Sequence, residues 1–126
     1  MNDTYELYAI KYGSVVNRPM SENFIGGDPH DTSKALDYFI WVATNKDRTF
    51  VIDTGFNHEV AAMRGRTIDR LPREGLELLG IDAGKVEDVI ITHLHYDHAG
   101  TFSDFKNARM HLQESEMHMA TGKCMC

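Results

Sequence analysis

The chain has 126 residues, of which 42% are hydrophobic and 25% are charged, and its formal net charge at pH 7 is -6. This length and composition suit one globular domain, or one half of a larger domain. The acidic balance argues against a nucleic-acid-binding protein, because the sequence has no basic stripe that could neutralise phosphates.

Three further features exclude other classes of protein. The polar start "MNDTYE" predicts no secretory signal, and the longest apolar run, "YFIWVA", is too short to span a bilayer. Cys124 and Cys126 are the only cysteines, so we expect no disulfide framework, and their spacing is shorter than that of usual zinc-binding pairs. We therefore predict a soluble, cytoplasmic protein with neither nucleic acid nor membrane as a partner.

The first half of the chain reads as three strands and a long loop. Residues 5–12, "YELYAIKY", are rich in strand-forming residues. Residues 17–33 carry Pro, Gly, Asp and Ser at high density and predict a loop of the length that often forms a lid or a pocket wall. Two more strands are predicted at 36–44 and 48–55, joined by a turn at 45–47.

The second half alternates helical and extended patterns. Residues 57–79 have a helical pattern, and Pro72 is expected to open its clearer helix. The predicted strand 86–92 has a nearly continuous apolar end, which is typical of burial on both faces. A short strand at 108–112 leads into a helical pattern at 113–120. This order predicts a mixed sheet covered by helices.

The stretch "THLHYDHAG" places three imidazoles and one carboxylate within six residues, directly after the strand at 86–92. On a helix, residues two apart point about 200° away from each other, so His93 and His95 could not share an ion. In an extended segment alternate side chains lie on one side, so His93, His95 and Asp97 would converge, with His98 following at the bend. The spacing therefore predicts a site for one metal ion or for two adjacent ions.

Imidazole and carboxylate ligands together suit zinc, with iron, manganese or cobalt as alternatives. Asp53 stands at the end of the neighbouring predicted strand, where it could accept the second N–H of a metal-bound histidine and so fix the ring. The alternative is a turn-forming Asp with no link to the site. "VIDTG" is also how the site of a small aspartic protease begins, but that interpretation leaves the clustered histidines unexplained.

Three residues are candidates for the wall of a substrate pocket. Tyr96 lies between predicted ligands, while Phe24 and His30 lie in the long loop at 17–33. The structural alternatives are an aromatic side chain in the core and an exposed loop histidine.

Several of these motifs resemble those of a known family. "THLHYDHAG" resembles the HxHxDH signature of the metallo-β-lactamase superfamily, and "FVIDTG" resembles the strand of that superfamily that ends in Asp-Thr-Gly. "GGDPHD", "LDYFIWV" and "HLQESEMHMATGKCMC" resemble, more narrowly, the branch that contains N-acyl-homoserine lactonases. The resemblance implies an α/β (α+β) fold, the αββα sandwich, of which residues 1–126 would be the N-terminal half.

The resemblance also implies a site and a reaction. His93 and His95 would bind one divalent ion, and Asp97 and His98 a second, with zinc expected at both. The remaining ligands and an oxyanion-stabilising tyrosine would come from sequence beyond Cys126, so we expect the 126 residues alone to bind metal weakly. The implied reaction is the opening of a lactone ring by a metal-bound hydroxide, with Asp97 also steering the proton of the leaving group.

Two alternatives stay open. The same signature occurs in other hydrolases of the superfamily, including thioesterases of the glyoxalase II type. In that case the small-molecule substrate would be an ester or thioester and not a lactone. The chain could instead be a noncatalytic half-domain that needs a complementary chain. A half-sandwich would leave an apolar sheet face exposed, which favours a homo-oligomer or a two-chain assembly.

Overall fold

The computed structural model describes residues 4–28 and 30–123, so Cys124 and Cys126 lie outside the described residues. Its strands are β1 (Glu6–Arg18), β2 (Lys34–Thr44), β3 (Thr49–Ile52), β4 (Thr67–Ile68), β5 (Asp88–Ile91) and β6 (Arg109–Leu112). Its α-helices are α1 (His58–Arg64), α2 (Pro72–Glu77) and α3 (Glu114–Thr121), and its 3-10 turns are η1 (Met20–Glu22), η2 (Ala83–Lys85) and η3 (Phe102–Asp104).

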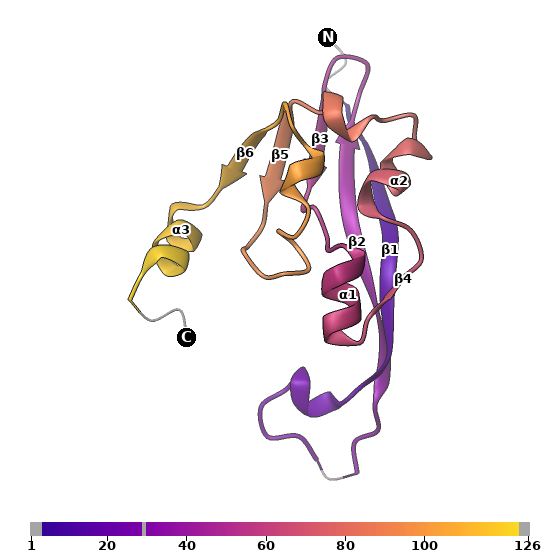
Figure 1. Ribbon diagram of the computed structural model, residues 1–126, viewed down its shortest axis with the longest axis vertical. Helices are drawn as coiled ribbons and strands as arrows, with labels where there is room; N and C mark the ends of the chain where they lie inside the picture. The colour runs from indigo at the N-terminus through magenta and orange to yellow at the C-terminus, as the bar shows by residue number, and fades with distance from the viewer. Residues whose placement is uncertain (1–3, 29, 124–126) are drawn as a thin grey trace.

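The strands form one mixed sheet in the order β4-β1-β2-β3-β5-β6 (Figure 1). Strands β1, β2 and β3 are antiparallel neighbours, as the short turn between β2 and β3 requires. Strand β5 runs parallel to β3, and β6 runs parallel to β5. The mixed sheet with helices that the sequence predicts is therefore confirmed.

Two of the predicted boundaries were wrong. The first strand does not end at residue 12 but continues to Arg18, which pairs with Lys34 after two irregularities in the register. The helical pattern at 57–79 is interrupted, because Gly65 ends α1 in the left-handed conformation at φ 64°. The chain then forms β4, which pairs with β1 through Ile68 and Gly13.

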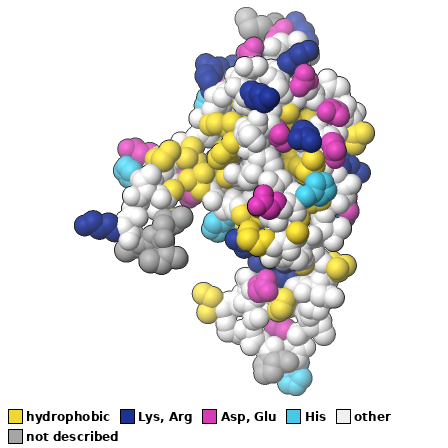
Figure 2. Space-filling model, viewed as in Figure 1, with side chains coloured by type: hydrophobic (Ala, Val, Ile, Leu, Met, Phe, Trp, Pro, Cys, Tyr) yellow, Lys and Arg dark blue, Asp and Glu magenta, His cyan; other side chains and the backbone are white. Residues whose placement is uncertain are grey.

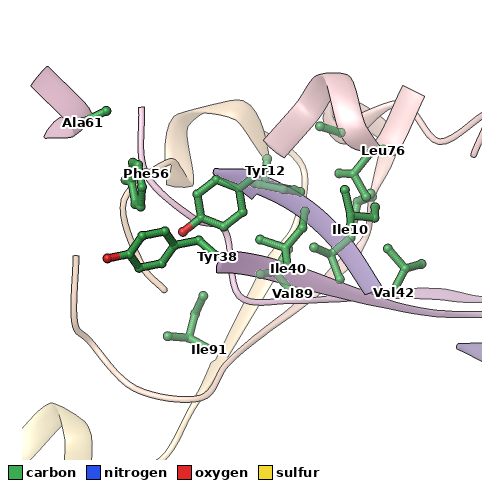
Figure 3. Close-up of a cluster of buried hydrophobic side chains, with 14 of the residues drawn as sticks. Ile10, Tyr12, Tyr38, Ile40, Val42, Phe56, Ala61, Leu76, Val89 and Ile91 are labelled. Carbon is green, nitrogen blue, oxygen red and sulfur yellow. The ribbon is translucent and has the colours of Figure 1, made fainter. Parts of the chain in front are cut away.

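The hydrophobic core lies between the sheet and helices α1 and α2 (Figure 3). Alternate side chains of the strands point to this side, and Tyr12, Ile40, Val42, Val51 and Val89 are fully buried there. The helices contribute Ala61 from α1 and Leu76 from α2, and Phe56 packs in the same cluster. Figure 3 shows side chains from the helices and from the strands meeting in this core.

The opposite face of the sheet is less covered. Phe39 and Trp41 of β2 are 38% and 49% exposed, and Ile90 of β5 is 37% exposed. The expectation that β5 is buried on both faces was therefore wrong for Ile90. Helices α1 and α2 both lie on the other side of the sheet, so they do not shield these side chains (Figure 1).

The surface carries charges of both signs. On the face seen in Figure 2, Lys and Arg side chains are interspersed with Asp and Glu side chains. Within residues 4–28 and 30–123, no helix has the length and apolar character needed to cross a membrane.

Candidate metal centre

The parallel pairing of β3 and β5 brings the ends of these strands together. Asp53 follows β3 and Thr92 follows β5, and the Asp53 N–H donates a 2.8 Å hydrogen bond to the carbonyl oxygen of Ile90. Asp53 has φ 64°, a left-handed conformation that Asp adopts more readily than most residues. This local geometry places a carboxylate behind the loop that carries the histidines.

The histidine loop is extended at first and then turns. The N–H groups of His98 and Ala99 both donate 3.0 Å hydrogen bonds to the carbonyl oxygen of His95. Asp97 therefore lies in a turn, and the expectation that it continues the extended alternation of His93 and His95 was wrong. The turn instead brings the imidazoles together, with ring centroids 4.5 Å apart for His93 and His95 and 3.9 Å apart for His93 and His98.

The buried carboxylate of Asp53 accepts hydrogen bonds from two residues of this loop. The Thr92 N–H donates at 2.8 Å and the Thr92 hydroxyl at 2.9 Å. The Asp53 carboxylate also lies 2.6 Å from Nδ1 of His98, which leaves Nε2 of that ring for another partner. This is the arrangement that orients a ligating histidine in metal sites.

These contacts shift the pKa values of the side chains around the histidine loop. Burial alone would raise the pKa of Asp53, but the hydrogen bonds from His98 and Thr92 outweigh it and hold that pKa below its usual value. Hydrogen bonds to Asp53 and then to Asp97 raise the pKa of His98 to about 9. Burial, followed by repulsion from the neighbouring imidazoles, lowers the pKa of His93.

Asp97 is held close to His98 from the opposite side. Its Oδ2 lies 3.4 Å from Nε2 of His98. Burial would raise the pKa of Asp97, but the His98 imidazole has the larger combined effect and the pKa lies below its usual value. Asp97 is therefore an ionised carboxylate at neutral pH.

The donor set has the chemistry of a zinc site, because three imidazoles and an ionised carboxylate gather at the end of one strand. Within the described ranges, however, no group of three His, Cys, Asp or Glu side chains is arranged to hold a single ion. The assignment of His93, His95, Asp97 and His98 as ligands, and of Asp53 as their support, stays a prediction.

Hydrogen bonds from distant elements to the backbone of the histidine loop hold it in place. The Tyr12 hydroxyl on β1 donates to the carbonyl oxygen of Asp97 at 2.8 Å. The Thr54 N–H donates to the carbonyl oxygen of His98 at 2.7 Å, and the Leu94 N–H donates to the Glu116 carboxylate at 3.0 Å.

Sequence reasoning missed these supports. Thr92, directly before the first histidine, could have been found from its place in the motif, but Tyr12 and Glu116 carry no local signal. The small size of Gly100, by contrast, is a signal that the sequence itself carries, because a Cβ there would lie 2.6 Å from the carbonyl oxygen of Gly55 and 2.7 Å from that of Tyr96.

Tyr96 lies beside the site, as its place in the motif suggested. Its ring packs against Phe56 with centroids 5.6 Å apart, and its hydroxyl lies 3.2 Å from that of Tyr38. Together with His95 and Asp97 it lines a hollow of about 470 Å³.

The two loop candidates lie elsewhere. Phe24 is 62% exposed, and His30 bonds through both its N–H and its ring to Asp28 in its own loop. Neither is among the described residues that line the hollow beside His95. A pocket role for Phe24, His30 and Tyr96 stays a prediction.

Comparison with known proteins gives a consistent picture. Residues 34–117 match the family model described as the metallo-beta-lactamase superfamily. None of the curated proteins compared with the chain matches it. Among solved structures, a quorum-quenching N-acyl homoserine lactone lactonase is similar, with a TM-score of 0.80 and 21% identity over 98% of this chain and 52% of that one.

Two further structures are similar. A mutant of AiiA from B. thuringiensis, solved with N-decanoyl-L-homoserine at its active site, has a TM-score of 0.72 and 18% identity over 98% of this chain and 54% of that one. AidC, a dizinc quorum-quenching lactonase solved with a product, has a TM-score of 0.65 and 16% identity over 94% of this chain and 45% of that one. The chain thus spans about half the length of these proteins, and the likeness confirms the predicted fold.

Proposed function

Because the chain belongs to the metallo-beta-lactamase superfamily, we propose that residues 1–126 form the N-terminal half of a metal-dependent hydrolase that opens lactone rings. The observation that carries the proposal is the cluster formed by His93, His98 and Asp97 at the end of β5, with Asp53 bonded to the far side of His98.

His93 and His95 would hold one divalent ion, and Asp97 and His98 a second, with zinc as the expected metal. Such ions, when bound, lower the pKa of water and polarise a carbonyl oxygen, which is the chemistry that ester hydrolysis needs. The Asp53 carboxylate keeps Nδ1 of His98 engaged, so that Nε2 remains available as a ligand atom. The family resemblance assigns the remaining ligands to sequence beyond Cys126.

Asp97 has a second proposed role. At neutral pH its carboxylate is ionised and can accept a hydrogen bond from a reacting group at the site. When the ring of a lactone opens, the departing alkoxide needs a proton. Asp97 would accept that proton from the attacking water and pass it to the alkoxide, which gives it a catalytic role in addition to ligation.

The choice of a lactone rests on the names of similar structures. The AiiA mutant was solved with N-decanoyl-L-homoserine at its active site, and AidC, a lactonase, with a product. A thioesterase of the glyoxalase II type would use the same donor set and is the alternative substrate class. A role in quorum quenching follows only if the lactone proposal holds.

Hydrolysis assays on the full-length protein test this function. We expect the zinc-loaded protein to open acyl-homoserine lactones faster than it cleaves a thioester with the same acyl group, and a chelator to abolish the activity. His95→Gln should reduce turnover by about a hundredfold or more, in the range expected when a catalytic metal site is damaged. His118→Gln, on the exposed face of α3, is the matched control and should retain activity.

A preference for the thioester would contradict the proposal that the substrate is a lactone, but it would still be consistent with a metal-dependent hydrolase. Equal activity in His95→Gln and His118→Gln would contradict the metal-dependent mechanism itself.

A noncatalytic half-domain is the second candidate, and the exposed side chains of Phe39, Trp41 and Ile90 favour it. An apolar sheet face of this kind favours association with a complementary chain or with a second copy. Intact mass and size-exclusion chromatography distinguish these cases. A species of 14.3 kDa that elutes as a dimer would support the noncatalytic assembly, whereas a longer polypeptide would support the hydrolase.

A further inference from the structure

Three arginine side chains gather around Tyr96, the residue between two predicted metal ligands. The guanidinium carbon of Arg64 lies 3.9 Å from the centroid of the Tyr96 ring, a cation–π distance. The Nε–H of Arg66 donates to the Tyr96 hydroxyl at 3.3 Å. Arg18 and Arg64 line the hollow beside the site together with Tyr96. We call Arg18, Arg64 and Arg66 the arginine cluster.

The cluster comes from separate parts of the chain. Arg18 is the last residue of β1, Arg64 is the last residue of α1, and Arg66 follows the glycine that ends that helix. Arg64 and Arg66 are near each other in the sequence, and the fold brings Arg18 of β1 to them.

The positive charge of the cluster is only partly balanced. One carboxylate, Glu22, serves two of the arginines, at 3.5 Å from Arg18 and 3.9 Å from Arg66. In residues 4–28 and 30–123, no Asp or Glu oxygen lies within 4.0 Å of the Arg64 guanidinium. Asp97, whose carboxylate is ionised, also lines the hollow, so the three arginines exceed the carboxylates of Glu22 and Asp97 by one formal positive charge in a protein whose overall charge is -6.

Two of these guanidinium groups are also largely withdrawn from water. The side chains of Arg18 and Arg66 are 22% and 15% exposed. The Nε of Arg18 is buried, lies 3.5 Å from the Glu22 carboxylate and makes no hydrogen bond to the described residues. Partial withdrawal from water strengthens the attraction between these guanidinium groups and an anion that enters the hollow.

Guanidinium groups recognise planar anions through paired N–H donors. We propose that the arginine cluster binds a carboxylate that the substrate carries outside the ring that is opened. This inference rests on the proposed function and adds to it a preference, among lactones, for those that carry a carboxylate over neutral ones. Arg64 is the expected specificity residue, because it lines the hollow and lacks a carboxylate partner there.

Binding by the metal-free full-length protein tests the proposal without hydrolysis. We expect calorimetric titration with glutarate to show binding, and titration with its neutral diamide, glutaramide, to show none. Arg64→Gln should weaken glutarate binding by about tenfold, the loss typical of one charged hydrogen bond. Arg64→Lys should retain part of the affinity for glutarate, because lysine keeps the positive charge but lacks the paired N–H donors of a guanidinium group. Arg73→Gln, an exposed arginine on α2, is the matched control and should bind as the unchanged protein does.

Equal affinities for glutarate and glutaramide, or equal effects of Arg64→Gln and Arg73→Gln, would overturn the proposal.

Hydrolysis by the zinc-loaded protein separates this proposal from the function on which it rests. Two lactones are compared, one whose side chain ends in a carboxylate and one that ends in the matching carboxamide. We expect a higher kcat/KM for the lactone that ends in a carboxylate than for the one that ends in a carboxamide. In Arg64→Gln, the ratio of these two kcat/KM values should fall by about fivefold or more. If neither lactone is opened, the hydrolase proposal fails, but the calorimetric titration with glutarate still shows whether the arginine cluster binds a carboxylate. If both are opened and the ratio is the same in Arg64→Gln, the inference fails and the hydrolase stands.

Discussion

The hydroxyl of Tyr12 donates a 2.8 Å hydrogen bond to the carbonyl oxygen of Asp97, although 85 residues separate the two in the chain. The Tyr12 ring is fully buried and packs edge-on against Phe56, with centroids 5.0 Å apart. One hydrogen bond therefore joins the hydrophobic core on β1 to the turn that carries two of the predicted metal ligands. The precision of that turn depends on the packing of the core.

Replacing Tyr12 with Phe tests this connection. The substitution keeps the ring in the core but leaves the carbonyl oxygen of Asp97 without its donor. We expect the free energy of unfolding to fall by about 1–3 kcal/mol, as for other hydrogen bonds lost from a buried partner. Urea denaturation measures the change. Tyr8→Phe, which removes an exposed hydroxyl bonded to Glu6, is the control and should change stability little. Equal stability of Tyr12→Phe and Tyr8→Phe would contradict the assigned role.

Asp53→Asn tests whether Asp53 supports a metal ligand or only forms a turn. Asn tolerates the left-handed backbone of this position but lacks the negative charge that faces His98. We expect the zinc affinity of the full-length protein to fall by about 10–100-fold, as for other carboxylates behind ligating histidines. Competition with a chromophoric chelator measures the affinity.

The matched control is Asp47→Asn, in the turn between β2 and β3, which should bind zinc normally. If Asp53→Asn also binds zinc normally, Asp53 is a turn-forming residue without a part in the site.

Gly100→Ala tests the close backbone approach behind the predicted metal ligands. The added Cβ would meet the carbonyl oxygens of Gly55 and Tyr96 at less than 3.0 Å, so the backbone has to shift. We expect a loss of about 1–3 kcal/mol in the free energy of unfolding, the usual cost of overpacking, together with weaker zinc binding. Thermal unfolding and chelator competition measure the two effects. Gly27→Ala, where the nearest atoms lie 3.8 Å from the added Cβ, should be tolerated, and an equal loss in both variants would count against the strain at Gly100.

Asp88 provides a prediction for the dependence of stability on pH. Its buried carboxylate lies 2.8 Å from Nε2 of His111 and 3.0 Å from Arg109, both on β6. The hydrogen bond to His111 is the main cause that lowers the pKa of Asp88, and the charge of Arg109 adds to it. Because the pKa is lower in the folded protein than in the unfolded chain, this contribution is present above about pH 4 and is lost as the pH falls through the native pKa.

We therefore expect Asp88→Asn to unfold at a lower temperature than the unchanged protein at pH 7, and the difference to shrink as the pH falls below about 4. Circular dichroism melts across this range measure it. A difference that stays constant with pH would show that the ionised form of Asp88 contributes nothing to stability.

Local patterns predicted much of the fold. Runs of apolar residues marked β2 and β5, Pro72 marked the start of α2, and the pattern after β6 marked α3. These features depend on residues that are neighbours in the chain, so they can be recognised without the rest of the molecule. Strand β4 could not be recognised, because its two residues become a strand only by pairing with β1.

The sequence by itself determined the chemistry that is available: three imidazoles and a carboxylate after an apolar strand, and an Asp after the strand before it. The tertiary structure alone decided how they meet, since the parallel pairing of β3 and β5 sets Asp53 against His98. It also decided that Tyr12 reaches Asp97 and that Arg64 lies over Tyr96. Each of these contacts joins segments whose separation is fixed by the packing of sheet and helices, and no short stretch of sequence carries that information.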